Sequence, residues 1–157
     1  MPAVLFVCSA NRVRSPMAAA LFARLLEEAG QTGWLVDSAG TWALPGGAPA
    51  ASGAVDTLAR RGLDLSRHRT KDVSTLALEI YDLILVMEPG QKEALRIEFP
   101  CAARRVYLLS ELSGPPRPVA DPYGQNPEAF EACAQDLERL LQRGIERIVG
   151  LCVPESD

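Results

Sequence analysis

The sequence predicts an α/β fold in three layers, a sandwich in which a central four-stranded parallel sheet carries helices on both faces. Two observations predict it. Short apolar runs rich in β-formers alternate with helical stretches along the 157 residues, as expected for right-handed crossovers between parallel strands. The first run, Val4–Val7, is continuously apolar, which is typical of a strand buried on both faces. Because 48% of the residues are hydrophobic, the chain can build one core, and we expect a single domain over residues 1–157.

The first half of the chain contains two predicted strands and two predicted helices. In chain order they are Val4–Val7, Ser15–Ala29, Trp34–Ser38 and Ala50–Arg61. The first helix starts at Ser15, which resembles an N-cap, with Pro16 in the first turn, and Gly30 closes it. Gly62 ends the second helix in the same way.

The second half continues the alternation. Its predicted elements are a short apolar helix around Val73–Leu78, a strand at Tyr81–Met87, a helix at Gly90–Phe99 and a strand at Arg105–Leu108. Three prolines within Ser113–Pro118 predict an extended surface loop. Asn126 and Pro127 then open a long amphipathic helix. Its apolar side is predicted to consist of Phe130, Cys133, Leu137, Leu140, Leu141, Ile145 and Ile148.

The composition argues against several classes of function. With 20 acidic and 16 basic residues the formal net charge is -4, which argues against an electrostatic nucleic-acid binder. No apolar run approaches the roughly 18 residues of a membrane span, and residues 1–20 lack a secretory signal, so we expect a cytoplasmic protein without membrane contact. The four cysteines form no Cys-x-x-Cys pair, and His68 is the single histidine, so we expect no disulfide framework, metal or cofactor. The sequence does not fix the oligomeric state, for which we favour a monomer. Three of these cysteines are expected to be inert packing residues, namely Cys101, Cys133 and Cys152.

The segment from Cys8 to Ser15 carries the predicted chemistry. It places a cysteine at the end of a strand and, after five intervening residues, an arginine and a serine at the start of a helix. The N–H groups of such a loop can converge on one anion, to which the helix N-terminus adds partial positive charge. Arg14 supplies a bidentate donor for phosphate oxygens, and a Ser15 hydroxyl that donates to the sulfur stabilises the Cys8 thiolate. We therefore predict a phosphate site at the carboxyl edge of the sheet, where the loops after the first, second and fourth strands meet.

This segment resembles the signature of the low-molecular-weight protein tyrosine phosphatases, Cys-x5-Arg-Ser after an N-terminal strand. The stretch Asp121-Pro122-Tyr123-Gly124 matches the general-acid loop of that family, and the resemblance covers nearly the whole chain. It implies that Cys8 is the nucleophile, that Arg14 binds phosphate, and that Asp121 protonates the leaving group and then activates water. The implied substrate is a phosphorylated protein or peptide that carries phosphotyrosine.

The resemblance also implies supporting residues. An asparagine in the family's loop holds that loop in shape through serine and histidine side chains, and the matching residues here are Asn11, Ser15, Ser38 and His68. Trp42 and Tyr123 match aromatic residues that wall the substrate cleft, and the alternative for Trp42 is a position that covers the core. The remaining residues expected around the phosphate are Ser9, Ala10, Arg12 and Val13.

Three residues depart from the family's pattern Cys-x-Gly-Asn-x-Cys-Arg-Ser. Ala10 replaces a glycine, so a methyl group must fit beside the anion or the loop must shift. Val13 replaces the second cysteine, which puts in doubt the protection of an oxidised Cys8 by a neighbouring disulfide. Arg12 stands where relatives often carry an apolar residue or threonine, and it is expected to favour acidic or phosphorylated peptide surroundings.

Other functions stay open at this point. Protein-arginine phosphatases share the fold, but they carry threonine where this chain has Arg12. Arsenate reduction by the same fold needs additional cysteines, and the region from Ile80 to Phe99 contains none. A phosphate-binding module without catalysis would require neither Cys8 nor Asp121.

Overall fold

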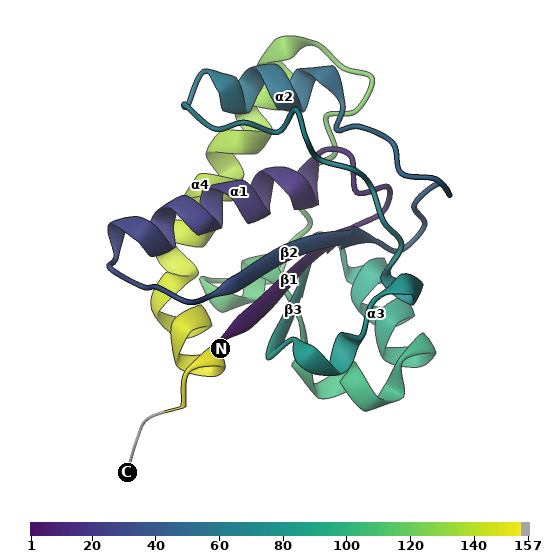
Figure 1. Cartoon of the computed structure of the whole chain (residues 1–157), viewed down its shortest axis with the longest axis vertical. Coiled ribbons are helices and arrows are strands. Elements are labelled where there is room, and N and C mark those ends of the chain that lie inside the picture. The colour runs from purple at the N-terminus through teal and green to yellow at the C-terminus, as the bar shows by residue number, and fades with distance from the viewer. Residues whose placement is uncertain (155–157) are drawn as a thin grey trace.

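The computed structural model describes residues 1–154 and confirms the predicted α/β sandwich (Figure 1). Its four strands are all parallel, in the order β2-β1-β3-β4. The strands are β1 (Ala3–Cys8), β2 (Leu35–Gly40), β3 (Leu83–Val86) and β4 (Val106–Leu108). The α-helices are α1 (Arg14–Glu28), α2 (Ser52–Ala59), α3 (Pro89–Glu98) and α4 (Pro127–Cys152). Short 3₁₀ segments complete the list, η1 (Val73–Thr75), η2 (Leu78–Ile80), η3 (Pro100–Arg105) and η4 (Leu109–Leu112).

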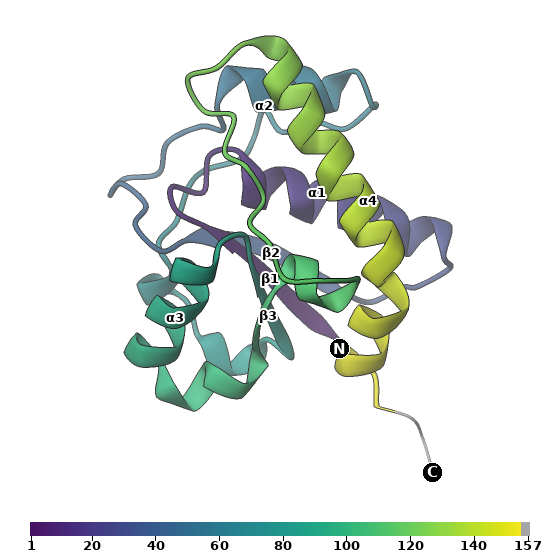
Figure 2. The ribbon, with the colours of Figure 1, turned by 180° about the vertical axis from the view of Figure 1, so that it is seen from behind.

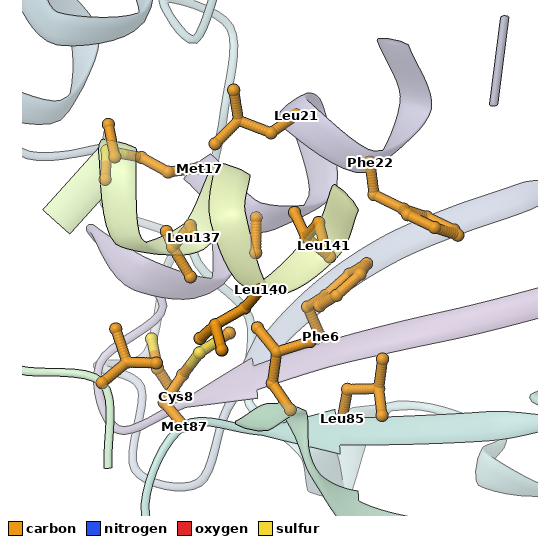
Figure 3. Close-up of a cluster of buried hydrophobic side chains, with 14 of the residues drawn as sticks. Phe6, Cys8, Met17, Leu21, Phe22, Leu85, Met87, Leu137, Leu140 and Leu141 are labelled. Carbon is orange, nitrogen blue, oxygen red and sulfur yellow. The ribbon is translucent and has the colours of Figure 1, made fainter. Parts of the chain in front are cut away.

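The central strand β1 feeds two cores, because successive side chains of a strand point to opposite faces. Phe6 and Cys8 belong to the core that α1 and α4 cover, whereas Leu5 and Val7 belong to the core that α3 covers. Figures 1 and 2 show α1 and α4 on one side of the sheet and α3 on the other. Figure 3 draws Cys8 in the first core, together with Met17 of α1 and Leu140 of α4. This alternation directs the cysteine side chain toward the start of α1.

The order of the strands creates a crevice beside β1. The chain passes from β1 to β2 on one side and later returns to β3 on the other side. Loops that leave β1 and β3 therefore diverge at the carboxyl edge of the sheet, the position at which open α/β sheets bind ligands. The loop that follows Cys8 lies at this position.

Two predictions of secondary structure are wrong. The segment Val73–Leu78 is no α-helix; it contains η1, a single turn in which the Asp72 side chain accepts the Ser74 N–H at 3.1 Å. The helix α1 begins at Arg14 and not at Ser15, so Ser15 is not its N-cap. The Ser15 hydroxyl is instead directed at the sulfur of Cys8, 3.0 Å away.

The long helix α4 begins as predicted, since the Asn126 side chain accepts the Ala129 N–H at 3.0 Å and Pro127 is the first helical residue. The predicted apolar side is buried except for Ile145, which is half-buried. Burial raises the pKa of the Cys133 thiol to about 12, and likewise that of Cys152, so both remain protonated. None of the helices in residues 1–154 is long and apolar enough to cross a membrane.

The prediction for Cys101 is wrong, because this residue is exposed. Cys101 lies near the start of η3, directly after Pro100. Only Ala102 of this short segment is buried, so an apolar local sequence does not bring the cysteine into the core.

Candidate active site

The loop between β1 and α1 turns back at Asn11. Asn11 is the only non-glycine residue in the described part of the chain with a positive φ, 61°, a region that asparagine adopts more readily than most residues. Ala10, the residue that replaces the family's glycine, has no positive φ and is exposed. The alanine therefore fits without backbone strain, and its methyl group borders the pocket described below.

The sulfur of Cys8 lies 3.0 Å from the Ser15 hydroxyl. The Asn11 side-chain amide donates to Ser15 Oγ at 2.8 Å and to Ser38 Oγ at 3.0 Å. Because Ser15 Oγ already accepts from Asn11, its own proton points to an acceptor, and the candidates are the Cys8 sulfur and the Ala39 carbonyl at 3.3 Å. The arrangement suits a hydroxyl that donates to a thiolate.

The segment of residues 68–71, which we call the strap, contacts Asn11 through His68 and Lys71. His68 Nε2 lies 2.8 Å from the Asn11 carbonyl, which can only accept, so Nε2 carries the proton. Burial lowers the pKa of His68, and the carbonyl bond only partly opposes that shift. The Lys71 N–H donates to Asn11 Oδ1 at 3.1 Å. His68 thus contacts the loop at the Asn11 carbonyl, and its lowered pKa favours the neutral ring.

Gly40, at the end of β2, lets the loop approach closely. The N–H groups of Thr41 and Trp42 donate to the carbonyls of Cys8 and Ser9, both at 2.9 Å. A Cβ on Gly40 would lie 2.5 Å from the Ser9 carbonyl oxygen, a clash with backbone that cannot be relieved by a rotamer. This role of Gly40 was not predicted, because a close approach between distant segments leaves no local signal in the sequence.

Arg14 is 2% exposed and is held on two sides. One terminal nitrogen donates to the Val119 carbonyl at 2.8 Å, and the other lies 3.4 Å from Glu88 Oε2 and 3.7 Å from Asp121 Oδ2. The guanidinium therefore has both carboxylates within ion-pair distance. Glu88 was not predicted from the sequence.

Gln91 connects this ion pair with the loop and was also missed. Its buried side chain donates to Ser9 Oγ at 3.0 Å and to Glu88 Oε2 at 3.1 Å. The side-chain oxygen Oε1 of Gln91 accepts hydrogen bonds from the backbone N–H groups of Met87 and Glu88, at 2.9 and 3.0 Å. The turn after β3 is thereby tied to the loop after β1. A polar residue in an amphipathic helix gives no sign of such a role until the helix is placed.

The loop that carries Asp121 crosses over the carboxyl edge of the sheet. The Val119 N–H donates to the Met87 carbonyl at 2.9 Å, and Pro122 is buried. Asp121 itself is exposed, and its Oδ1 accepts the Tyr123 N–H at 3.1 Å. One carboxylate oxygen is thus fixed by the backbone, and the other faces Arg14.

These side chains surround one cavity of about 260 Å³, which we call the thiol pocket. It is lined by Cys8, Ala10, Arg12, Val13, Arg14, Trp42, Leu44, Asp121 and Tyr123. Trp42 is 81% exposed, so it does not cover the core. Leu44, beside it on the rim, was not predicted.

Arg12 and Tyr123 form one wall of the thiol pocket as a pair. Arg12 donates to the Tyr123 hydroxyl at 3.1 Å, and its guanidinium carbon lies 5.5 Å from the ring centroid, within the range of a cation–π contact. A second bond, 3.2 Å long, joins Arg12 Nε to the Pro49 carbonyl. The three loops predicted to meet at the carboxyl edge do meet here, together with the turn after β3.

Chemically, the thiol pocket suits phosphoryl transfer to sulfur, because a cysteine, a buried guanidinium and a carboxylate converge on a space of small-molecule size. This is the chemistry of the cysteine-dependent phosphoester hydrolases. The model of the family described as Low molecular weight phosphotyrosine protein phosphatase matches residues 3–149. The chain belongs to this family, whose general activity is hydrolysis of phosphotyrosine in proteins.

Individual relatives are similar over almost their full length. A probable low molecular weight protein-tyrosine-phosphatase of Ralstonia nicotianae is 36% identical over 94% of this chain and 97% of its own. The Protein-arginine-phosphatase of Geobacillus stearothermophilus is 34% identical over 92% and 95%. The crystal structure of the low molecular weight protein tyrosine phosphatase from T. tengcongensis superposes with a TM-score of 0.87 at 36% identity, covering 94% of this chain and 99% of that one.

Proposed function

We propose that this protein hydrolyses phosphotyrosine in phosphorylated proteins or peptides, through a cysteinyl-phosphate intermediate. The observation that carries the proposal is the convergence of Cys8, Arg14 and Asp121 on the thiol pocket. Trp42 and Tyr123 give this pocket aromatic walls against which a phenol ring can stack. The buried part of the pocket would bind the phosphoryl group, and the aromatic walls would contact the phenol ring.

In the first step, the Cys8 thiolate attacks phosphorus and the bond from phosphorus to the tyrosine oxygen breaks. Asp121 gives its proton to that oxygen, so tyrosine leaves as a neutral phenol. Arg14 and the N–H groups of the loop hold the phosphoryl oxygens and offset their negative charge, so the residues at hand supply what a metal would otherwise supply. The Ser15 hydroxyl, 3.0 Å from the sulfur, supports the thiolate.

In the second step, a water molecule attacks the phosphorus of the cysteinyl phosphate. Asp121, now a carboxylate, accepts a proton from this water as the phosphorus–sulfur bond breaks. Inorganic phosphate leaves, and the Cys8 thiolate and the Asp121 carboxylic acid are restored. The 3.7 Å separation between Asp121 and Arg14 supports a role for the carboxylate next to the bound phosphoryl group.

Phosphoarginine is the alternative substrate, because two relatives are named Protein-arginine-phosphatase. The presence of Arg12 favours phosphotyrosine over phosphoarginine. A neutral aromatic ring can lie beside the guanidinium of Arg12, as the Tyr123 ring does at 5.5 Å. A substrate guanidinium in the same place would meet a like charge. Two peptides of one sequence, phosphorylated on tyrosine or on arginine, test this: we expect faster phosphate release from phosphotyrosine, and the reverse order would contradict the proposal.

We further propose that the chain acts as a single domain and a monomer in the cytoplasm. All residues of the proposed mechanism lie between Cys8 and Asp121 of one chain, which supports a self-sufficient unit. All four cysteines are free, as is usual for proteins of reducing compartments. Sedimentation at micromolar concentration tests the monomer.

A further inference from the structure

A second, larger cavity lies beside the thiol pocket, and we call it the side cavity. Its volume is about 600 Å³, and it is lined by α2 with Arg60 directly after it, by the start of α4, and by Arg12 and Tyr123. Because Arg12 and Tyr123 line both cavities, their side chains form the wall between them. Figures 1 and 2 agree in showing α2 beside the start of α4. A Cβ on Gly53 would lie 2.7 Å from the Phe130 ring, so the two helices meet closely here.

The side cavity has an excess of positive charge although the chain carries a formal net charge of -4. Arg12 and Arg60 line it, against Asp56 as the single carboxylate. One terminal nitrogen of Arg60 donates to Thr57 Oγ1 at 3.3 Å and lies in a long ion pair, 3.9 Å from Glu131. That carboxylate is already bonded to Arg61 at 2.6 and 2.8 Å, so the Arg60 guanidinium keeps donors for another acceptor.

The opposite flank of the thiol pocket is apolar. Trp42 and Leu44 stand there, 81% and 68% exposed. A peptide whose phosphorylated residue enters the thiol pocket therefore meets aromatic and aliphatic surface on one side and guanidinium groups on the other. The two flanks of the substrate are not equivalent.

We propose that the side cavity binds an acidic side chain, Asp or Glu, next to the phosphotyrosine of a peptide substrate, and that Arg60 determines this preference together with Arg12. The inference rests on the proposed function and names its substrate class. The acidic side chain passes the Arg12–Tyr123 wall, and its carboxylate accepts hydrogen bonds from Arg60. Because Arg60 is partly exposed, with 55% of its side chain accessible, we expect about a two- to five-fold preference.

The test compares phosphotyrosine peptides of one sequence in which the residue before or after the phosphotyrosine is Asp, Ala or Lys. Each kcat/KM is divided by the same enzyme's kcat/KM for phenyl phosphate, which is too small to reach the side cavity. We expect one Asp peptide to exceed its Lys counterpart, with a ratio that falls as salt is added. Arg60→Gln should lower this ratio toward one, with Arg12 accounting for what remains, and Asp56→Asn should increase it.

Arg143→Gln is the matched control, because Arg143 is an exposed arginine of α4 that lines neither cavity. It should keep the wild-type ratio. Equal kcat/KM for Asp and Lys peptides in the wild type, or an undiminished preference in Arg60→Gln, would overturn the assignment of the side cavity. If phenyl phosphate and all the peptides stayed intact, the proposed function itself would fall, and this inference with it.

Discussion

The loop after β1 and the rim of the thiol pocket differ in how far the fold determines them. In the loop, Asn11 is fully buried, and its carbonyl, its Oδ1 and its amide nitrogen all have partners. On the rim, Trp42, Leu44 and Tyr123 are exposed. Buried hydrogen bonds therefore fix the loop that is proposed to bind phosphate. The side chains that would contact the rest of the substrate are exposed and, within residues 1–154, have no such bonds from the core.

The largest effect is expected at the centre of the loop. Replacing Cys8 by Ser removes the proposed nucleophile but keeps a side chain of similar shape, so hydrolysis of phenyl phosphate should fall by more than about 10⁴-fold. Thermal unfolding should hardly change, since Ser15 can donate to either side chain. Steady-state kinetics on purified protein, with a melting curve as control, measures both. Substantial residual turnover would mean that another group attacks phosphorus.

The next largest effect is expected for Asp121. This residue lies on the exposed rim, but it is proposed to act in the reaction as the general acid. Asp121→Ala should reduce hydrolysis of phenyl phosphate by about 10²- to 10⁴-fold. The loss should shrink for p-nitrophenyl phosphate, because that leaving group departs without a proton. Asp121→Asn serves as the matched control for the lost charge. Equal losses on the two substrates would contradict the role as general acid.

Substitutions of Asn11 test whether its buried hydrogen bonds stabilise the loop between β1 and α1. Asn11→Ala removes the bonds to Ser15, Ser38 and Lys71 and places alanine at a φ of 61°, so the free energy of unfolding should fall by about 2–4 kcal/mol. Asn11→Gly removes the same bonds without the strain and should lose less. Urea unfolding of the three proteins separates the two contributions. Wild-type stability in both variants would show that the loop needs no such network.

The comparison also explains what the sequence could predict. The four strands and α4 follow from runs of residues that are close in the chain, and so does the Cys8 to Ser15 motif. Glu88, Gln91 and Gly40 were missed because their roles depend on contacts across the carboxyl edge of the sheet. The prediction of Ser15 as an N-cap failed for the same reason: local preference favours a cap, but the hydroxyl is used at the sulfur of Cys8.

The strap behind the loop predicts a pH dependence. Burial lowers the pKa of His68 in the folded protein below the usual value of 6.5, so the unfolded chain binds a proton more readily. The stabilisation is complete above about pH 6.5 and is lost as the pH falls toward the lower pKa of the folded state. His68→Gln keeps a side-chain donor but does not titrate. Between pH 7 and pH 5 the free energy of unfolding of the wild type should therefore fall relative to that of His68→Gln. A difference that does not change with pH would contradict the role of His68 as a neutral hydrogen-bond donor to the loop.

The smallest effect is expected on the rim. Tyr123→Phe removes the hydroxyl that accepts from Arg12 at 3.1 Å but keeps the ring under the guanidinium. An exposed hydrogen bond of this kind is worth at most about 1 kcal/mol, so kcat/KM for a phosphotyrosine peptide should change by less than about five-fold. Tyr123→Ala, which also removes the ring, should raise KM further and leave kcat for phenyl phosphate nearly constant. If Tyr123→Phe lowered kcat as strongly as Asp121→Ala, the rim would take part in the chemistry, and the division between a buried loop and an exposed rim would not hold.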